Sequence, residues 1–272
     1  MRLINQRLSP PALLALKLAP FALLIIAYVI GSAARLADNP ADKLLPAFSS
    51  MANAIDMMAF TPDRRTGDYL LWSDTAASLQ RLGAGLGIST ALALVMGVAI
   101  GIFPAMRALL GSFVGFISMV PPLALLPILF IMLGLGEVSK VALIVIGIAP
   151  LMIRDTSQRV MDLPREQIVK AETLSANSWL IVWRVVLPQI LPRLISSLRL
   201  QLGAAFLFLI AAEAISSESG LGYRIFLVRR YLSMDIIFPY VAWITFIAAM
   251  ADYTLERLRR WLFPWAQMEG TT

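Results

Sequence analysis

Two ionisable side chains interrupt one long apolar stretch and are the first candidates for chemistry. Glu213 lies near one end of residues 194–215, and Arg199 lies near the other end, beside Gln201. Ionisable groups inside a membrane span are costly, and they usually mark a solute path, a gate or an ion pair. Glu213 is predicted to be either a gate residue or a structural acid that pairs with Arg224 or accepts backbone hydrogen bonds. Arg199 either lines a path with Gln201 or extends its head to the membrane surface.

The composition excludes most covalent chemistry. The 272 residues include no Cys and no His, which removes thiolate nucleophiles, imidazole bases and the metal sites built from either group. An intramembrane enzyme would need a Ser with a Lys, and neither Lys17 nor Lys140 has a convincing partner. The chain also has no G-x-x-x-x-G-K-[ST] phosphate-binding loop. We therefore expect a protein that is not an enzyme, with no catalytic residue, no metal site and no cofactor bound by this chain.

Apolar content predicts an all-α integral membrane protein. Hydrophobic residues make up 59% and charged residues 15%, and the mean hydropathy is +0.77. A helix needs roughly 20 apolar residues to cross about 30 Å of hydrocarbon. About six transmembrane helices are predicted, at residues 13–34, 82–103, 109–133, 141–153, 194–215 and 236–253.

These spans divide the chain into four parts. Residues 1–36 hold an N-terminal segment and a retained first helix, residues 37–80 an external loop with a short helix near 48–60, residues 81–260 the transmembrane core, and residues 261–272 a tail. Within the core, residues 154–193 form a cytoplasmic segment between spans four and five.

Charge asymmetry predicts the orientation. The net charge of +6 is scattered and forms no single patch, which argues against a nucleic-acid partner. Residues 38–74 carry six Asp against Lys43, Arg64 and Arg65, whereas most basic residues fall on the other side. Because Lys and Arg favour cytoplasmic loops, both termini should be cytoplasmic. The basic side comprises Arg2, Arg7, Arg107, Arg154, Arg159, Arg165, Lys170, Arg184, Arg193, Arg257, Arg259 and Arg260.

Prolines and glycines shape the second and third spans. Pro121, Pro122 and Pro127 remove backbone donors, so the third span should kink or break. Broken helices are tolerated where they face protein or a water-filled path, so Pro121 and Pro122 are candidates for a translocation path or for a purely structural kink. In the second span, two glycine pairs, at 83 and 87 and at 97 and 101, should allow close helix packing.

The 40 residues at 154–193 exceed what a simple connection needs. A helix is predicted at 165–174, a break at Ser175 to Ser178, and a second helix at 179–187 capped by Ser178, after which Pro188 and Pro192 turn the chain into the next span. Trp179, Val182, Trp183 and Val186 would form one apolar stripe. The stripe suits either a groove on a partner protein or the lipid surface.

This segment resembles the cytoplasmic signature of membrane subunits of bacterial ATP-binding-cassette importers: Glu-Ala-Ala, three residues, Gly, nine residues, Ile, one residue, Leu-Pro. With Leu187 and Pro188 at Leu-Pro, the Ile position is Val185, the Gly position is Ser175, and Glu-Ala-Ala falls on Val169, Lys170 and Ala171. The spacing is kept, whereas Val169, Lys170 and Ser175 depart from the signature.

Three further stretches strengthen the resemblance. "DTAASLQRLGAG", "PPLALLPILFIMLGLGEVSK" and "SGLGYRI" are similar to the nitrate, sulfonate and taurine branch of these permeases, and the likeness extends over residues 44–260.

The resemblance implies a permease of a bacterial inner membrane that forms a path for a small, often anionic solute. Its partners would be two ATPase subunits that use ATP and Mg, an external solute-binding protein, a second permease subunit, expected to be a second copy of this chain, and membrane lipid. The implied contacts with the ATPase are Lys170, Ala171, Glu172, Leu174, Ser175, Ala176, Trp179, Trp183, Val185, Leu187 and Pro188. An ion-coupled carrier is the alternative, although the chain has few intramembrane acids and no evident repeat.

Overall fold

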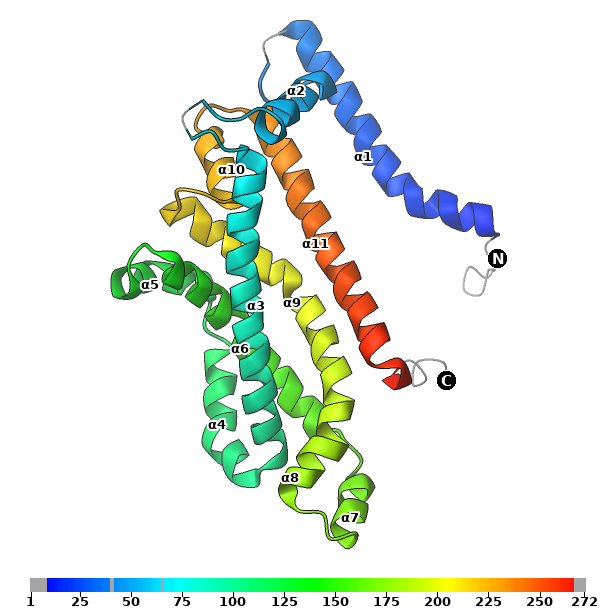
Figure 1. Ribbon diagram of the computed structural model, residues 1–272. Coiled ribbons are helices and arrows are strands. Elements are labelled where there is room, and N and C mark those ends of the chain that lie inside the picture. Colours follow the sequence, from blue (N-terminus) through cyan, green and yellow to red (C-terminus); the bar gives the residue numbers. More distant parts are fainter. Residues whose placement is uncertain (1–8, 40–41, 65, 267–272) are drawn as a thin grey trace.

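The computed structural model describes residues 9–39, 42–64 and 66–266, and every regular element within them is helical (Figure 1). The predicted all-α class is therefore confirmed. Arg2, Arg7 and Arg65, which entered the prediction of orientation, lie outside the described residues. The elements are α1 (Pro10–Asp38), α2 (Phe48–Ala59), α3 (Leu70–Ile102), α4 (Pro104–Ile117), the 3₁₀-helix η1 (Pro122–Leu125), α5 (Leu126–Leu133), α6 (Glu137–Met161), α7 (Arg165–Thr173), α8 (Ser178–Ile181), the π-helix η2 (Val182–Val186), α9 (Leu187–Ser216), α10 (Leu221–Arg229) and α11 (Met234–Leu262).

Among the described residues, four helices are long and apolar enough to cross a membrane. They are α1, α3, the continuous run Ser178–Ser216 and α11. A fifth span results if α4 and Pro122–Leu133, which meet at 84°, are counted together. The prolines therefore break the third span as predicted. The predicted fourth span lies within α6, which is long enough but carries charged residues at both ends, so the count of six stays a prediction.

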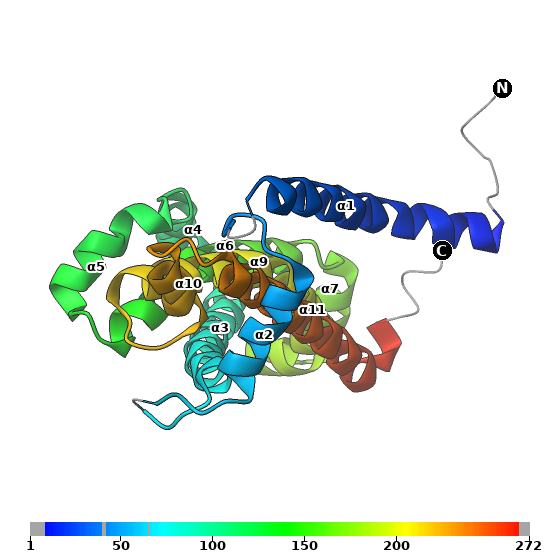
Figure 2. The ribbon, with the colours of Figure 1, turned by 90° about the horizontal axis from the view of Figure 1, so that it is seen from above.

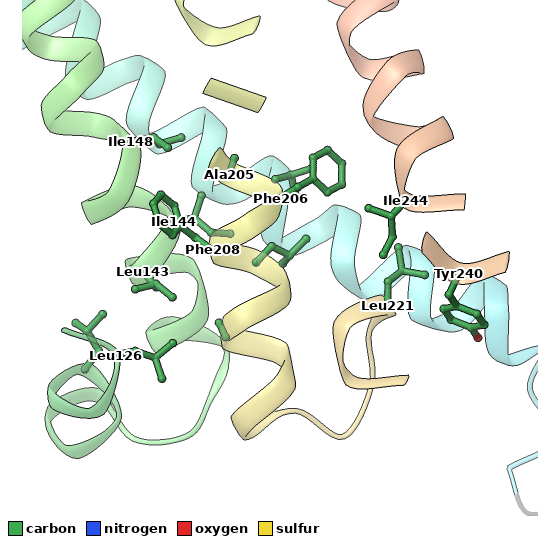
Figure 3. Packing of buried hydrophobic residues seen from close by; sticks show 14 of the residues in the cluster. Leu126, Leu143, Ile144, Ile148, Ala205, Phe206, Phe208, Leu221, Tyr240 and Ile244 are labelled. Atoms are coloured by element: carbon green, nitrogen blue, oxygen red, sulfur yellow. The ribbon is translucent and has the colours of Figure 1, made fainter. Parts of the chain in front are cut away.

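The core forms where α6 and α9 pack beside α3. Leu143, Ile144 and Ile148 of α6 meet Ala205, Phe206 and Phe208 of α9, and Leu221, Tyr240 and Ile244 extend the cluster towards α10 and α11 (Figure 3). These side chains come from helices far apart in the sequence, so their burial joins the C-terminal half of the chain to α3.

Only one of the two predicted glycine pairs packs against a neighbouring helix. A Cβ atom at Gly97 would lie 2.7 Å from Thr156 Cβ, and one at Gly101 would lie 2.4 Å from Val160 Cβ, so α3 and α6 touch closely there. Gly83 and Gly87 have no atom within 4 Å of the corresponding position.

Helix α1 stands beside the other helices and touches them mainly near its C-terminal end (Figures 1 and 2). The Tyr28 hydroxyl donates to the Pro46 carbonyl at 2.6 Å, and its ring contacts Phe48 and Phe238. Arg35 pairs with Asp42 in the following loop, and this hydrogen bond lowers the pKa of the Asp42 carboxyl. Helix α2 occupies the position predicted for a short loop helix.

The glycine contacts give a stability prediction. Gly101→Leu should lower the free energy of unfolding by about 1–3 kcal/mol or more, because Val160 and the Ser157 carbonyl leave no room for a side chain. Gly87→Leu is the matched control and should be neutral or slightly stabilising, because its surroundings are open and Leu favours helix. Thermal unfolding of the purified protein in detergent measures both changes. Equal losses in the two variants would contradict the assigned packing.

Candidate functional sites: the α7–α8 hairpin and a buried charge network

The α7–α8 hairpin, residues 165–181, closely follows the prediction in its first half. Helix α7 ends at Thr173, one residue before the predicted end. The predicted cap of the second helix is wrong, because Asn177 Oδ1 accepts the Leu180 N–H at 2.8 Å and Ser178 is already the first helical residue.

Ser175 stands in the left-handed conformation that glycine would adopt most easily. Its φ is 59°, its N–H donates to the Glu172 carbonyl at 2.9 Å, and the Ala176 N–H donates to the Ala171 carbonyl at 3.0 Å. This pair of bonds is a Schellman helix ending. The turn at the signature's glycine position is therefore kept, although a side chain makes it strained.

Pro188 and Pro192 do not turn the chain, contrary to the prediction, and both lie within helix α9. A proline ring clashes with the carbonyl four residues earlier, and the helix before Pro188 widens into the π-helix η2, where the Leu187 N–H donates to the Val182 carbonyl. Gln189 Nε2 donates to the Val185 carbonyl at 2.7 Å, and Trp265 Nε1 donates to the Pro188 carbonyl at 3.4 Å. The helix therefore continues without a turn from Ser178 to Ser216.

The predicted single apolar stripe is divided between two faces. Val182 and Val186 are buried against α3 and α6, with Ile181 and Ile190 beside them. Trp179 and Trp183 point outwards and remain 69% and 65% exposed. The reason is the π-helix, which changes the angular spacing of these side chains. We call Val169, Leu174, Trp179, Leu180 and Trp183, all exposed, the hairpin surface.

The other residues predicted to contact an ATPase divide by exposure. Lys170, Glu172 and Ser175 are exposed beside the hairpin surface. The remaining members are partly buried and connect the hairpin to the bundle: Ala171, Ala176, Val185, Leu187 and Pro188.

At the opposite end of the bundle, Glu213 is completely buried within a network of charged groups. Its carboxylate accepts hydrogen bonds from Ser78 Oγ at 2.7 Å, Arg81 Nη1 at 2.7 Å and the Gly222 N–H at 2.8 Å. Of the two alternatives for a structural acid, the backbone hydrogen bond is present, whereas the ion pair is made with Arg81 of α3 and not with Arg224. Glu213 is thus an acid paired with a base and hydrogen-bonded to backbone.

Arg224 pairs instead with Asp74, which is 1% exposed. Asp74 Oδ2 accepts Arg224 Nε at 2.8 Å and the Tyr240 hydroxyl at 3.2 Å, while Oδ1 accepts the Gly220 N–H at 2.9 Å. Sequence reasoning placed Asp74 in an external loop and did not select Arg81. The signal that could have found them is their spacing, because positions 74, 78 and 81 share one face of a helix.

The network requires glycine at position 220. Gly220 has a φ of 130°, and a Cβ atom there would lie 2.5 Å from the Glu213 carboxyl carbon. The residue directly precedes α10, so the helix begins at Leu221 immediately after this strained position. The Leu221 N–H donates to Ser78 Oγ at 2.9 Å, which ties the start of α10 to α3.

A second acid completes the network. Glu137 Oε1 accepts hydrogen bonds from Arg81 Nη2 at 2.9 Å and from Lys140 Nζ at 2.8 Å. Lys140, which had no evident partner in the sequence, is therefore ion-paired. We call Asp74, Ser78, Arg81, Glu137, Lys140, Glu213, Arg224 and Tyr240 the charge network.

The structure does not bring the predicted path residues together. Arg199 pairs with Asp252 of α11 at 2.7 Å and with Glu256, so it bridges two helices. Gln201 is partly buried on the same helix, and Pro121 and Pro122 lie at the break between α4 and η1. Arg199 and Glu213 are 14 residues apart on α9, which separates them by roughly 21 Å.

Comparison with known proteins agrees with this architecture. Residues 86–267 match the family described as binding-protein-dependent transport system inner membrane component. The chain belongs to this family, and it is a permease of an ATP-binding-cassette importer from the taurine, sulfonate and nitrate branch.

Several curated relatives carry more specific names. The chain is 33% identical to the taurine transport system permease protein TauC of Escherichia coli strain K12 over 198 residues, which is 73% of this chain and 72% of TauC. It is 27% identical to the putative aliphatic sulfonates transport permease protein SsuC of Bacillus subtilis strain 168, over 72% and 71% of the two chains. It is 29% identical to the bicarbonate transport system permease protein CmpB of Synechococcus elongatus, over 74% and 72%.

A solved structure shares the fold. A chain from an inward-facing conformation of the MetNI methionine ABC transporter superposes with a TM-score of 0.57 at 17% sequence identity, over 70% of this chain and 93% of that one. At this identity the match supports the fold alone.

The strained cap gives a local prediction. Ser175→Gly should stabilise the end of α7 by about 1 kcal/mol, because glycine adopts a φ of 59° without steric cost. Amide hydrogen exchange over α7 should slow by roughly fivefold. The control is Thr173→Gly, which lies inside α7 and should speed exchange. Faster exchange in Ser175→Gly would contradict the assigned cap.

The network gives a global prediction. Glu213→Ala should lower the free energy of unfolding by about 3–5 kcal/mol, because it leaves part of the buried Arg81 charge unpaired. Arg81→Met combined with Glu213→Leu removes both charges of this pair and should lose less than the sum of the two single changes. Thermal unfolding measures these losses, with exposed Glu218→Ala as a control. A loss in Glu213→Ala no larger than in the control would rule out a structural pair.

Proposed function

We propose that this importer permease works as a pair of identical copies that form a path for a small anionic solute. Two ATPase subunits dock on the hairpin surface, and an external solute-binding protein delivers the solute. ATP and Mg are bound by the ATPase subunits, and this chain catalyses no covalent step. The path alternates between outward and inward openings as the ATPases bind and hydrolyse ATP.

The observation that carries the proposal is the hairpin surface itself. Leu174 is 83% exposed, and two tryptophans on the next helix are also largely exposed. Exposed aromatic and aliphatic side chains on a rigid element are typical of the anchors of a protein interface. The side of the hairpin that faces the bundle is held by packing, because Ile181, Val182 and Val186 are buried there.

The names of the relatives support the solute class. Taurine, aliphatic sulfonates and bicarbonate each carry a small anionic oxygen-bearing group, although they differ in the rest of the molecule. A sulfonate or an oxyanion of similar size is therefore the proposed solute.

The sidedness follows from the position of the basic residues. Arg154, Arg159, Arg165, Lys170 and Arg184 lie in α6, the α7–α8 hairpin and η2. That end is proposed to be cytoplasmic, with both termini on the same side. Residues 38–74 and 216–235, at the opposite end, then face the solute-binding protein.

Capture of the ATPase tests the proposal. The chain, solubilised from its native membrane, should bring down an ATP-binding-cassette subunit, and the pair Glu172→Arg with Trp183→Glu should reduce the captured ATPase at least tenfold. The physical reason is that a new charge at the centre of an apolar contact must be desolvated. Mass identification of partners and ATPase activity are the two measurements.

Trp261→Glu is the matched control. Trp261 is 78% exposed but lies on α11 and is not part of the hairpin surface, so capture should be unchanged. If the ATPase is still captured with the double variant, or is lost equally with the control, the hairpin is not the docking element.

A further inference from the structure

Two nearly buried cations of the charge network share one exposed acid. The side chains of Arg81 and Lys140 are 6% and 4% exposed, whereas the side chain of Glu137 is 61% exposed. Charged groups removed from water are normally held by partners that are buried with them. Here the partner that covers both cations is the one with free access to solvent.

Arg81 uses its two edges differently. Nη1 donates inwards, to Glu213 Oε1 at 2.7 Å and to the Ser219 carbonyl at 2.8 Å. Nε and Nη2 donate outwards, as a fork, to the two carboxylate oxygens of Glu137. The inner edge is thus structural, while the outer edge presents the geometry that binds a planar or tetrahedral oxyanion with two parallel hydrogen bonds.

Lys140 supplies a third hydrogen-bond donor to the position of the Glu137 carboxylate, beside Nε and Nη2 of Arg81. Its Nζ lies 2.8 Å from Glu137 Oε1, and Glu137 is its only hydrogen-bonded partner among the described residues. An anion in the position of the Glu137 carboxylate would therefore meet one guanidinium fork and one ammonium group.

The local charge suits a monoanion. Asp74 and Arg224 neutralise each other in their own pair. Without the Glu137 carboxylate, Arg81, Lys140 and the buried Glu213 would leave one net positive charge. One incoming negative charge would restore neutrality, so an anion could replace Glu137 without changing the net charge of the site.

Two glycines before Glu137 leave room for its side chain to move away from Arg81 and Lys140. Glu137 is the first residue of α6, and Gly134, with a φ of 78°, and Gly136 precede it. A Cβ atom at either glycine would meet no atom within 4 Å, so no neighbouring element packs against these two positions.

The geometry points to an anion-binding site between Arg81 and Lys140 that takes the sulfonate, carboxylate or similar oxyanion group of the transported solute, with the Glu137 carboxylate as its internal substitute when the site is empty. This inference rests on the proposed function for the nature of the solute. In this assignment Arg81 and Lys140 bind the solute in the translocation path. The Glu137 carboxylate pairs with both cations between transport cycles, when no solute anion is bound.

Chemical rescue tests the site on the full-length, detergent-purified protein, with ethanesulfonate as the probe. Glu137→Ala should lower the melting temperature by roughly 5–15 °C, because two cations lose their shared partner. Ethanesulfonate at about 10–50 mM should restore at least half of that loss, whereas sodium chloride at equal ionic strength should not. Glu137→Gln, which keeps the side-chain shape, replaces the alanine variant if that variant does not accumulate.

Two controls make the result specific. Glu218→Ala removes an exposed acid outside the network and should show neither the loss nor the rescue. Lys140→Met added to Glu137→Ala should abolish the rescue, because one of the three donors is gone. Rescue that is absent, equal with chloride, or unchanged by Lys140→Met would overturn the site.

The outcome is independent of the ATPase test. The melting temperature requires neither ATP hydrolysis nor a solute-binding protein. Failed rescue with normal ATPase capture would overturn this site and leave the importer assembly standing. Rescue without ATPase capture would support the anion site and overturn the docking role of the hairpin surface.

Discussion

A charge buried in an apolar helical bundle must be paired, and this constraint organises one end of the molecule. Asp74, Arg81, Lys140 and Glu213 are each 5% exposed or less. Leaving any of them without a partner would be strongly destabilising. Their partners come from α3, α6, α9, α10 and α11, so satisfying the charges sets the relative positions of five helices. Apolar contacts are not directional, and they would accept several packings that these ion pairs do not.

The same network lies at one end of the longest helical run. Residues Ser178–Ser216 form 39 consecutive helical residues, roughly 58 Å, with Trp179 and Trp183 near one end and Glu213 near the other. One continuous helical run therefore joins the hairpin surface to the charge network. The π-helix before Pro188 is an irregular part of this run, and π segments of this kind often occur at functional positions.

The stretches that resemble other permeases also contain most of the charge network. "DTAASLQRLGAG" supplies Asp74, Ser78 and Arg81; "PPLALLPILFIMLGLGEVSK" supplies Glu137 and Lys140; and "SGLGYRI" supplies Gly220 and Arg224. The likeness to the sulfonate branch therefore concerns this end of the bundle as well as the α7–α8 hairpin. At the hairpin, Ser175 departs from the signature in residue type but keeps its backbone conformation.

The sequence by itself determined the all-α class, the break at Pro121 and Pro122, the helices near 48–60 and 165–174, and the membrane family, because apolar runs, prolines and spacing are local properties. It could not determine that Glu213 meets Arg81, which lies 132 positions earlier, in preference to Arg224, which lies 11 positions later. It also missed that Pro188 widens a helix without ending it, because the neighbours that accept the widened turn come from α3 and α6. Only the tertiary structure decided these points, because ion pairing in a bundle depends on which helices become neighbours, and that is settled by the packing of the whole chain.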